Sequence, residues 1–398
     1  MAAELGPLDP SPERRFASLK QMRADGDVHP LASGRYIAVS HETVATGLGT
    51  VDSFGGSAGQ EGLPEEDTMI AGILEPRHGQ IRRIINAVIA FHRSQKIEPY
   101  LRSFCAANMQ AVLADGSEGR PVQVMKRYVD PLPPAAMARL LGFPEEDSAG
   151  YYKWGANVGQ AFGRAAAEGT TISLRQASPE MAGYVDARIA ERSATDPESW
   201  PQDALTRFLT TEVDGERLSQ RAISTQVMFA IGAGSDTTRN ALGSLLYRLG
   251  SDPDVYRDLR QDRSLIPDAI EEGLRLDAPA QFLVRQCLVP EFELGGARLR
   301  EGDSVILSIG SANRDESVFS DPERYDHQRA NLREHLTFGT GRHICPGSAL
   351  ARLELRVALE TWCDHVEAFR IADGYEWEPP PTGMLHGPER LQLVITPA

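Results

Sequence analysis

Apolar residues recur with helical spacing through most of the chain. Residues 12–25 and 77–92 carry apolar side chains three and four positions apart, and similar patterns dominate from 99 to 277. The longest, LSQRAISTQVMFAIGAGSDTTRNALGSLLYRLG, predicts one helix over 218–250 that Ser219 or an adjacent residue caps. Two glycines in its middle each cost about 0.5–1 kcal/mol relative to alanine, so they invite an explanation.

Strand-like patterns are confined to shorter segments. RYIAVS at 35–40 predicts a strand, and 281–310 contains FLVRQCLV, FELGG and RLREGDSVILSI, separated by glycine turns. We therefore expect a mainly α fold with a smaller β portion, in a single domain over 1–398. The expected β-rich parts are about 30–45, 281–310 and 366–398, and the expected helical body is about 76–277 and 348–365.

Composition narrows the class of protein. A chain of 398 residues, 41% of them hydrophobic, can enclose a cofactor of porphyrin size. The formal net charge of −15 argues against binding to nucleic acid or to anionic membranes. Neither a signal peptide nor an apolar run of about 18 residues is present, so we expect a cytoplasmic protein without a membrane segment. The four cysteines lie far apart, which favours reduced thiols over a disulfide framework.

One of these cysteines lies in an unusual loop. The segment HLTFGTGRHICPGSALARLELRVALE at 335–360 places Cys345 among glycines at 339, 341 and 347, directly before a helical pattern. Glycines allow positive φ and a close approach of the backbone to a flat ligand. The following proline suits the first turn of a helix, and a helix N-terminus favours the thiolate that binds metal.

Two other interpretations of this loop compete. A lone cysteine is often a small buried apolar residue. Zinc is the second alternative, because His335, His343 and Cys345 are potential ligands. Their spacing does not match the usual zinc arrangements, and no second pair completes four ligands.

The pattern Phe338-Gly339-x-Gly341-x-His343-x-Cys345-x-Gly347 resembles the haem-binding loop of the cytochrome P-450 family, the haem-thiolate monooxygenases, in its soluble bacterial form. The resemblance implies that Cys345 is the axial ligand of haem b (iron protoporphyrin IX), and that Phe338 and Gly339 contact the cofactor. A thiolate ligand pushes electron density onto iron and favours O–O cleavage. The implied fold holds the haem between the long central helix and the helix after the Cys345 loop.

The long helix carries a second match. AGSDTT at 233–238 is similar to the oxygen-activating segment of that family. By this match Ala233 and Gly234 line the groove for dioxygen, and Asp236 and Thr237 are the acid–alcohol pair. A hydroxyl can hold an ordered water and a carboxylate can relay protons from solvent, as O–O cleavage requires. The alternative is an ordinary helix on which Asp236 faces water.

A third match is structural. EEGLR contains Glu272 and Arg275, which share a helix face at i,i+3 and resemble the Glu-x-x-Arg pair of the family. Arg329 matches the third member of that set. We expect the three to support the Cys345 loop, and Gly273 within the same helix has no explanation at this stage.

Haem carries two propionates, which need cationic or hydrogen-bonding partners once they are buried. The residues that match propionate contacts of the family are His78, Arg82, Arg285, His335 and His343.

The resemblance implies an enzyme that activates dioxygen to hydroxylate or epoxidise a mostly apolar small organic molecule, with secondary metabolism as one candidate setting. Oxidative coupling or cyclisation that forms C–C, C–N or C–O bonds is the alternative, and a non-catalytic haem-binding protein is a third. The candidate substrate contacts are Met228, Phe229, Gln281, Phe282, Leu283, Val284, Met384 and Leu385. Electrons are expected from NAD(P)H through a ferredoxin reductase and a ferredoxin that docks on Arg82, Arg83, Arg342 and Arg352 of a monomer.

Overall fold

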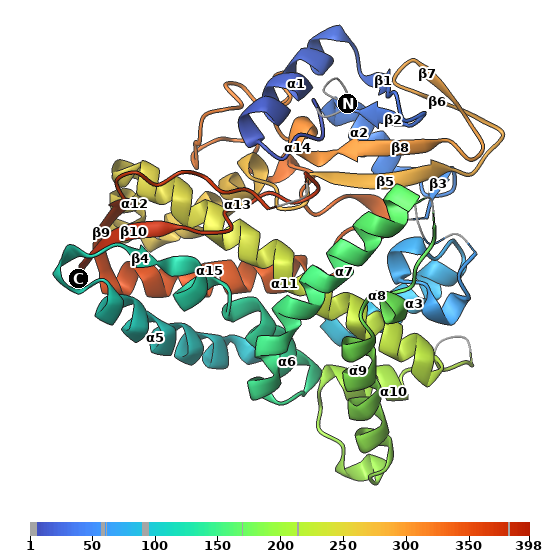
Figure 1. Cartoon of the computed structure of the whole chain (residues 1–398), viewed down its shortest axis with the longest axis horizontal. Coiled ribbons are helices and arrows are strands. Elements are labelled where there is room, and N and C mark those ends of the chain that lie inside the picture. The colour runs from blue at the N-terminus through green and yellow to red at the C-terminus, as the bar shows by residue number, and fades with distance from the viewer. Residues whose placement is uncertain are drawn as a thin grey trace.

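One long helix, α11 (Gln220–Ser251), runs through the middle of the molecule, and most other helices pack around it (Figure 1). Its start is the predicted one, because the Ser219 hydroxyl accepts a hydrogen bond from the Ala222 N–H at 3.1 Å. The computed structural model describes residues 6–56, 60, 62–89, 95–168, 170–212, 215–380 and 383–398.

The predicted helices at 12–25 and 348–365 are confirmed, and the pattern at 77–92 is helical as far as residue 89, beyond which its last residues lie outside the described part. The helices are α1 (Pro12–Asp25), α2 (His41–Gly49), α3 (Arg77–Ile89), α5 (Glu98–Asp115), α6 (Leu132–Leu141), α7 (Ala149–Glu168), α8 (Leu174–Ala177), α9 (Pro179–Ser193), α10 (Ala204–Thr210), α11, α12 (Pro253–Gln261), α13 (Ile266–Leu276), α14 (Ile309–Ala312) and α15 (Ser348–His365). Shorter turns include a π-helix over Met125–Val129 and a 3-10 helix over Gly341–His343.

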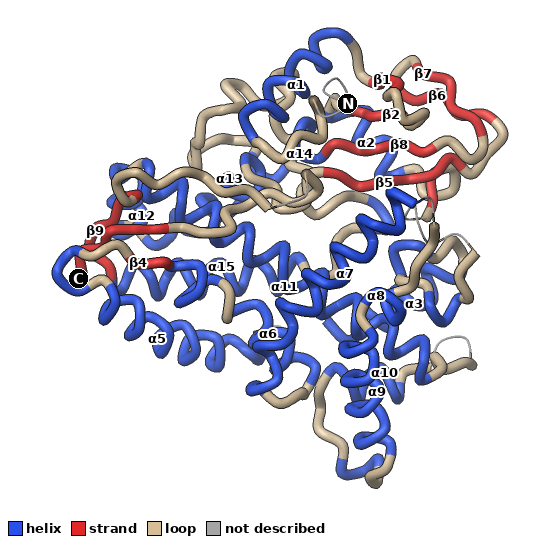
Figure 2. The backbone as a smooth tube through the Cα atoms, in the orientation of Figure 1, coloured by secondary structure: helices blue, strands red, loops and turns tan. Residues whose placement is uncertain are grey.

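The strands form two sheets and a hairpin. They are β1 (Val28–Pro30), β2 (Tyr36–Ala38), β3 (Phe54–Gly55), β4 (Val122–Gln123), β5 (Phe282–Cys287), β6 (Glu291–Leu294), β7 (Ala297–Arg300), β8 (Ser304–Ser308), β9 (Val366–Ile371) and β10 (Gln392–Pro397). The larger sheet has the order β1-β2-β8-β5-β3, in which only β2 and β8 run parallel; the smaller has the order β4-β10-β9, and β6 pairs with β7. Figure 2 shows the larger sheet along the upper edge and the smaller one at the left end of the helical body.

One boundary differs from the sequence prediction. The range 30–45 was expected to be β-rich, but α2 begins at His41. Val44 and Leu48 lie one turn apart and are almost fully buried in the cluster beneath the larger sheet. Directly after residue 40, the buried apolar residues therefore follow the spacing of a helix and no longer the alternation of a strand.

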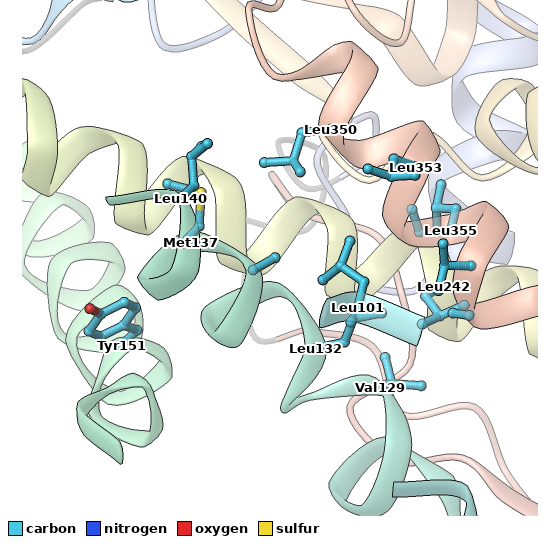
Figure 3. Close-up of a cluster of buried hydrophobic side chains, with 14 of the residues drawn as sticks. Leu101, Val129, Leu132, Met137, Leu140, Tyr151, Leu242, Leu350, Leu353 and Leu355 are labelled. Carbon is cyan, nitrogen blue, oxygen red and sulfur yellow. The ribbon is translucent and has the colours of Figure 1, made fainter. Parts of the chain in front are cut away.

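The main core lies between α11 and the helices beside it. Figure 3 shows Leu242 of α11 next to Leu355 of α15, within a cluster that also includes side chains of α5 and α6. This packing explains Gly273, because a Cβ there would lie 3.1 Å from Cδ1 of Leu245. The glycine lets α13 approach α11 closely.

No helix among the described residues is both long enough and apolar enough to cross a membrane.

A buried ion pair within α13 is the centre of a network that joins this helix to the irregular segment 313–329. Nε and Nη2 of Arg275 donate to the two carboxylate oxygens of Glu272 at 2.7 and 2.8 Å, and both side chains are fully buried. Nη1 of Arg275 also donates to the carbonyl oxygens of Asn313 and Pro322, at 2.7 and 2.9 Å. Arg329 reaches Glu272 Oε1 at 3.5 Å. The three residues thus form one buried network, and their role as a support behind the Cys345 loop stays a prediction.

We predict that Glu272→Ala lowers the free energy of unfolding by about 3–5 kcal/mol, because it leaves two buried guanidinium groups without their counter-charge. The measurement is a urea titration followed by circular dichroism. The matched control is Asp254→Ala, which breaks the exposed i,i+3 pair between Asp254 and Arg257 at 2.7 Å and is expected to cost less than about 1 kcal/mol. Equal losses in the two variants would contradict a structural role for Glu272.

Candidate active site

A tight turn presents the sulfur of Cys345. The Cys345 N–H donates to the Phe338 carbonyl oxygen at 2.7 Å, which closes the loop on itself. Gly339 and Gly341 have φ of 69° and 68°, a left-handed conformation that other residues adopt only under strain. A Cβ at 341 would also lie 3.3 Å from the Cα of Gly49, at the end of α2. These two positions therefore require glycine, as predicted, because the backbone there is left-handed.

The start of α15 lies directly behind this sulfur. Burial raises the pKa of the Cys345 thiol, while the backbone N–H groups of Gly347 and Ser348 and the charges of Arg82 and Arg352 lower it. The sequence predicted that the helix N-terminus would favour the thiolate; the N–H groups do act in that direction, but burial outweighs them. This raised pKa is compatible with a metal-bound sulfur, because a bound metal ion deprotonates a coordinating thiol outright.

The middle of α11 is more exposed than the buried stretches 222–228 and 238–246 on either side of it. Ala233 is exposed, and Gly232, Gly234, Asp236 and Thr237 are half-buried. A Cβ at 232 would meet no atom within 4 Å, whereas a Cβ at 234 would lie 2.9 Å from Sδ of Met137. Gly234 therefore allows α6 to pack closely, and packing gives no reason for Gly232.

The acid and the alcohol lie on this stretch. The Thr237 hydroxyl donates to the Ala233 carbonyl oxygen at 2.8 Å, one turn earlier. Burial raises the pKa of Asp236 to about 6, and nearby Glu389 adds to the rise, while the positive charge of Arg239 opposes it. A carboxyl group that titrates near neutral pH can both hold and release a proton under ordinary conditions.

Four of the five predicted propionate contacts gather near the Cys345 loop. The rings of His78 and His343 stack with centroids 3.9 Å apart, and Arg82 donates through Nη2 to the Ile344 carbonyl oxygen. Burial is the main cause that lowers the pKa values of both histidines, and the charge of Arg285 nearby lowers them further.

Arg285 shows that this group fits an anionic ligand. Its side chain is buried on β5 and donates only to the carbonyl oxygen of Val284, at 3.1 Å. No carboxylate of the described residues pairs with it, and burial lowers its pKa. Burial also lowers the pKa of His343, to about 4. A buried cation without a counter-ion is costly, so the site suits the two carboxylates of a haem.

The prediction that the fifth residue, His335, contacts a propionate is wrong. Its Nε2 lies 3.2 Å from Oε2 of Glu271, and its Nδ1 accepts a hydrogen bond from the Thr337 N–H at 3.3 Å. Both ring nitrogens are therefore engaged by protein groups. A family match placed this histidine with the propionates, but Glu271 takes it instead.

Glu271 and Arg352 form a support that the sequence did not predict. Arg352 donates through Nε and Nη2 to Glu271 at 2.6 and 2.9 Å, and its guanidinium carbon lies 4.3 Å from the centre of the Phe338 ring. The pair thus fixes the aromatic ring that begins the Cys345 loop. The contact joins residues 81 positions apart, and no local pattern signals it.

The candidate substrate residues do not form one wall. Phe282 and Val284 pack against the cluster that includes Leu19 and Ile37, on the opposite face of β5 from Arg285. Gln281 is also fully buried, and its Nε2 donates to the Ala278 carbonyl oxygen at 2.6 Å. These three predictions are corrected: the residues belong to the core around the larger sheet.

The remaining candidates are placed differently. Met228 is buried in the main core, which corrects that prediction too. Phe229 and Leu283 are half-buried, and Leu283 shares the face of β5 that carries Arg285. Met384 is 44% exposed, and Leu385 forms a bridge with Ala280.

The zinc interpretation finds no support in the geometry. Within the described ranges, no three His, Cys, Asp or Glu side chains come together so as to hold a metal ion.

Comparison with known proteins supplies independent evidence. The family model described as Cytochrome P450 matches residues 172–365. The steroid C26-monooxygenase of Mycobacterium tuberculosis is 30% identical over 387 residues, which cover 96% of this chain and 94% of that protein. Cytochrome P450 CYP109Q5 from Chondromyces apiculatus has a similar structure, with a TM-score of 0.83, 26% identity and 98% of each chain covered. A mutant of P450 EryK in complex with erythromycin B gives a TM-score of 0.85 at 25% identity, over 96% of this chain and 95% of that one.

The likenesses to the Mycobacterium tuberculosis relative and to the two solved structures extend over nearly the whole chain and agree with the mainly α fold and its smaller sheets. The predicted relationship is therefore confirmed, and the protein belongs to the cytochrome P450 family, as a monooxygenase with bacterial relatives.

Proposed function

We propose that this chain hydroxylates a C–H bond or epoxidises a C=C bond of a mostly apolar small molecule, of steroid or macrolide type. One arrangement carries the proposal: the sulfur of Cys345 at the start of α15, with the acid Asp236 and the alcohol Thr237 in the middle of α11. The class of substrate rests on two of the similar proteins, one named for a steroid and one bound to erythromycin B.

When bound, haem b would supply an iron ion that binds and reduces dioxygen, with Cys345 as its thiolate ligand. His78, Arg82, Arg285 and His343 would hold the propionates. Asp236 takes up a proton from the solvent side and donates it towards the substrate side. The Thr237 hydroxyl, now bonded to a backbone carbonyl oxygen, can turn to hold the water that receives this proton.

Half-buried apolar side chains support an apolar substrate. Phe229 lies one turn before Ala233 on α11, and Leu283 lies on the Arg285 face of β5. The turn with Met384 and Leu385 adds two further apolar side chains. Ligand pockets are lined mainly by such side chains, with a small number of polar groups that set orientation.

We further propose that the electrons come from NAD(P)H through a reductase and a ferredoxin. Arg342 is 57% exposed within the Cys345 loop, where its Nη1 lies 3.3 Å from Oδ1 of the exposed Asp52, and Arg83 is exposed on α3. Positive side chains on this side can attract an acidic ferredoxin in spite of the negative net charge. Arg352 contributes less than expected, because Glu271 holds its guanidinium.

We predict that the haem-loaded protein, given electrons and isotopically labelled dioxygen, places one labelled oxygen atom in a steroid or macrolide substrate. The measurement is mass spectrometry of the product. An oxidised product without label would identify oxidative coupling or cyclisation instead. Binding of the substrate without any product would indicate a non-catalytic haem protein.

The same assay tests the acid and the alcohol. Asp236→Asn and Thr237→Ala are each expected to slow product formation about 100-fold or more, because a positioned proton donor typically contributes that much. Thr210→Ala is the matched control, since Thr210 makes the same hydrogen bond to a carbonyl oxygen one turn earlier, on α10. Unchanged product formation in both site variants would exclude these residues from proton delivery.

We predict that Arg83→Glu and Arg342→Glu each slow reduction by a ferredoxin at least about tenfold at low salt, with a smaller effect at high salt. Stopped-flow absorption measures the rate. Arg298→Glu is the control, because Arg298 is 75% exposed on the β6–β7 hairpin and lies outside the predicted docking set. If all three variants are reduced at the same rate, the docking face lies elsewhere.

A further inference from the structure

We propose that Arg239 is a positioning residue for Asp236, and that Asp130 and the Pro388–Glu389 segment hold its guanidinium away from the Asp236 carboxyl group. The inference deepens the proposed function, since it rests on Asp236 as the proton donor.

Asp236 and Arg239 carry opposite charges at positions that favour an ion pair, but they do not form one. They lie three positions apart on α11, where opposite charges on one helix face usually attract each other. Yet among the residues that the structure describes, none donates a hydrogen bond to Asp236. Its carboxyl group lies instead against α7, where a Cβ at Gly155 would be 3.1 Å from Oδ2.

The guanidinium of Arg239 is fully engaged elsewhere. Nε donates to Oδ1 of Asp130 at 2.8 Å, and Nη1 donates to Oδ1 of Asn240 at 2.9 Å and to the Pro388 carbonyl oxygen at 3.3 Å. Nη2 donates to the Glu389 carbonyl oxygen at 3.2 Å and lies 3.8 Å from Oε2 of the same residue. Each of the three nitrogens therefore has a partner that turns it away from Asp236.

Three segments outside α11 surround this guanidinium: the residue after the π-helix, the C-terminal segment and α7. Asp130 directly follows the π-helix Met125–Val129, and its N–H donates to the Met125 carbonyl oxygen at 2.7 Å. Glu389 lies in the C-terminal segment. Tyr152 of α7 completes the enclosure, with its ring 5.3 Å from the guanidinium carbon and its hydroxyl 3.4 Å from Oε2 of Glu389. The Arg239 side chain is only 4% exposed, so it cannot turn without breaking several of these contacts.

This arrangement has a clear electrostatic effect. Burial raises the pKa of Asp236 to about 6, Arg239 opposes the rise from a distance, and Glu389 reinforces it. Tyr152 and Asp130 are the other titratable groups around the guanidinium. A direct ion pair would lower the pKa by about 1–3 units and leave the acid ionised at neutral pH. By preventing that pair, the contacts of Arg239 keep Asp236 able to carry a proton.

The test measures the pKa of Asp236 in the haem-loaded protein by infrared difference spectroscopy of its carboxyl band, with Asp236→Asn as the reference that lacks the band. Asp130→Ala is expected to lower this pKa by about one unit or more, because the released Arg239 can reach the acid. Asp130→Asn removes the same charge but keeps an acceptor for Nε, so a smaller fall is expected. If the alanine variant does not fold, Asp130→Ser replaces it, since the serine side chain is too short to reach Arg239.

Asp115→Ala is the matched control, because it breaks a comparable pair with Arg127 at 2.6 Å on the protein surface, and it is expected to leave the Asp236 band unchanged. The proposal is overturned if Asp130→Ala leaves the pKa unchanged or raises it. It is equally overturned if the asparagine and alanine variants shift the pKa by the same amount, since loss of charge alone would then explain the effect.

The pH dependence of product formation separates this inference from the proposed function. If the infrared pKa falls and the pH profile moves with it, both stand. If the pKa falls while the profile stays in place, Arg239 still positions Asp236, and Asp236 is not the proton donor.

Discussion

The Cys345 sulfur has to be held at one point, directly before the start of α15. The backbone does most of this work: the bond from the Cys345 N–H to the Phe338 carbonyl oxygen closes the loop, and two left-handed glycines shape it. Behind the loop, Arg352 lies over the Phe338 ring. In a separate network, Arg275 of the buried Glu272–Arg275 pair donates to the Asn313 and Pro322 carbonyl oxygens, and so ties α13 to the segment that leads into the loop.

Positive side chains gather beside the Cys345 loop, in contrast to the negative net charge of the protein. The chain has a net charge of −15, yet the space beside the Cys345 loop gathers Arg82, Arg285 and two stacked histidines. On α11, burial raises the pKa of the Asp236 carboxyl group to about 6. Two arginines and two hydrogen-bonding histidines for a dianionic cofactor, and a single proton-carrying acid, serve different tasks, and the fold keeps them on separate elements.

Local sequence patterns predicted the features that depend on local geometry. The long helix with its Ser219 cap follows from spacing, and the Cys345 loop follows from a specific motif. Contacts between distant residues left no such signal: Glu271 meets His335 64 positions away, and Asp130 meets Arg239 109 positions away.

The error over β5 has a different origin. Side chains alternate along a strand, so Phe282 and Val284 cannot share a face with Leu283 and Arg285. Of the candidate substrate residues in FLVR, the period of two assigns only Leu283 to the face that carries Arg285. His335 was misplaced because a family match was carried over without a physical reason at that position.

The central claim is that iron is bound by the sulfur of Cys345, and the absorption spectrum of the reduced carbon monoxide complex tests it most directly. The account predicts the long-wavelength Soret band of a thiolate-ligated haem in the wild type and in Cys105→Ser, Cys287→Ser and Cys363→Ser, and its loss in Cys345→Ser. A wild-type band at the shorter wavelength of nitrogen-ligated haem, or a thiolate band that survives in Cys345→Ser, would contradict it.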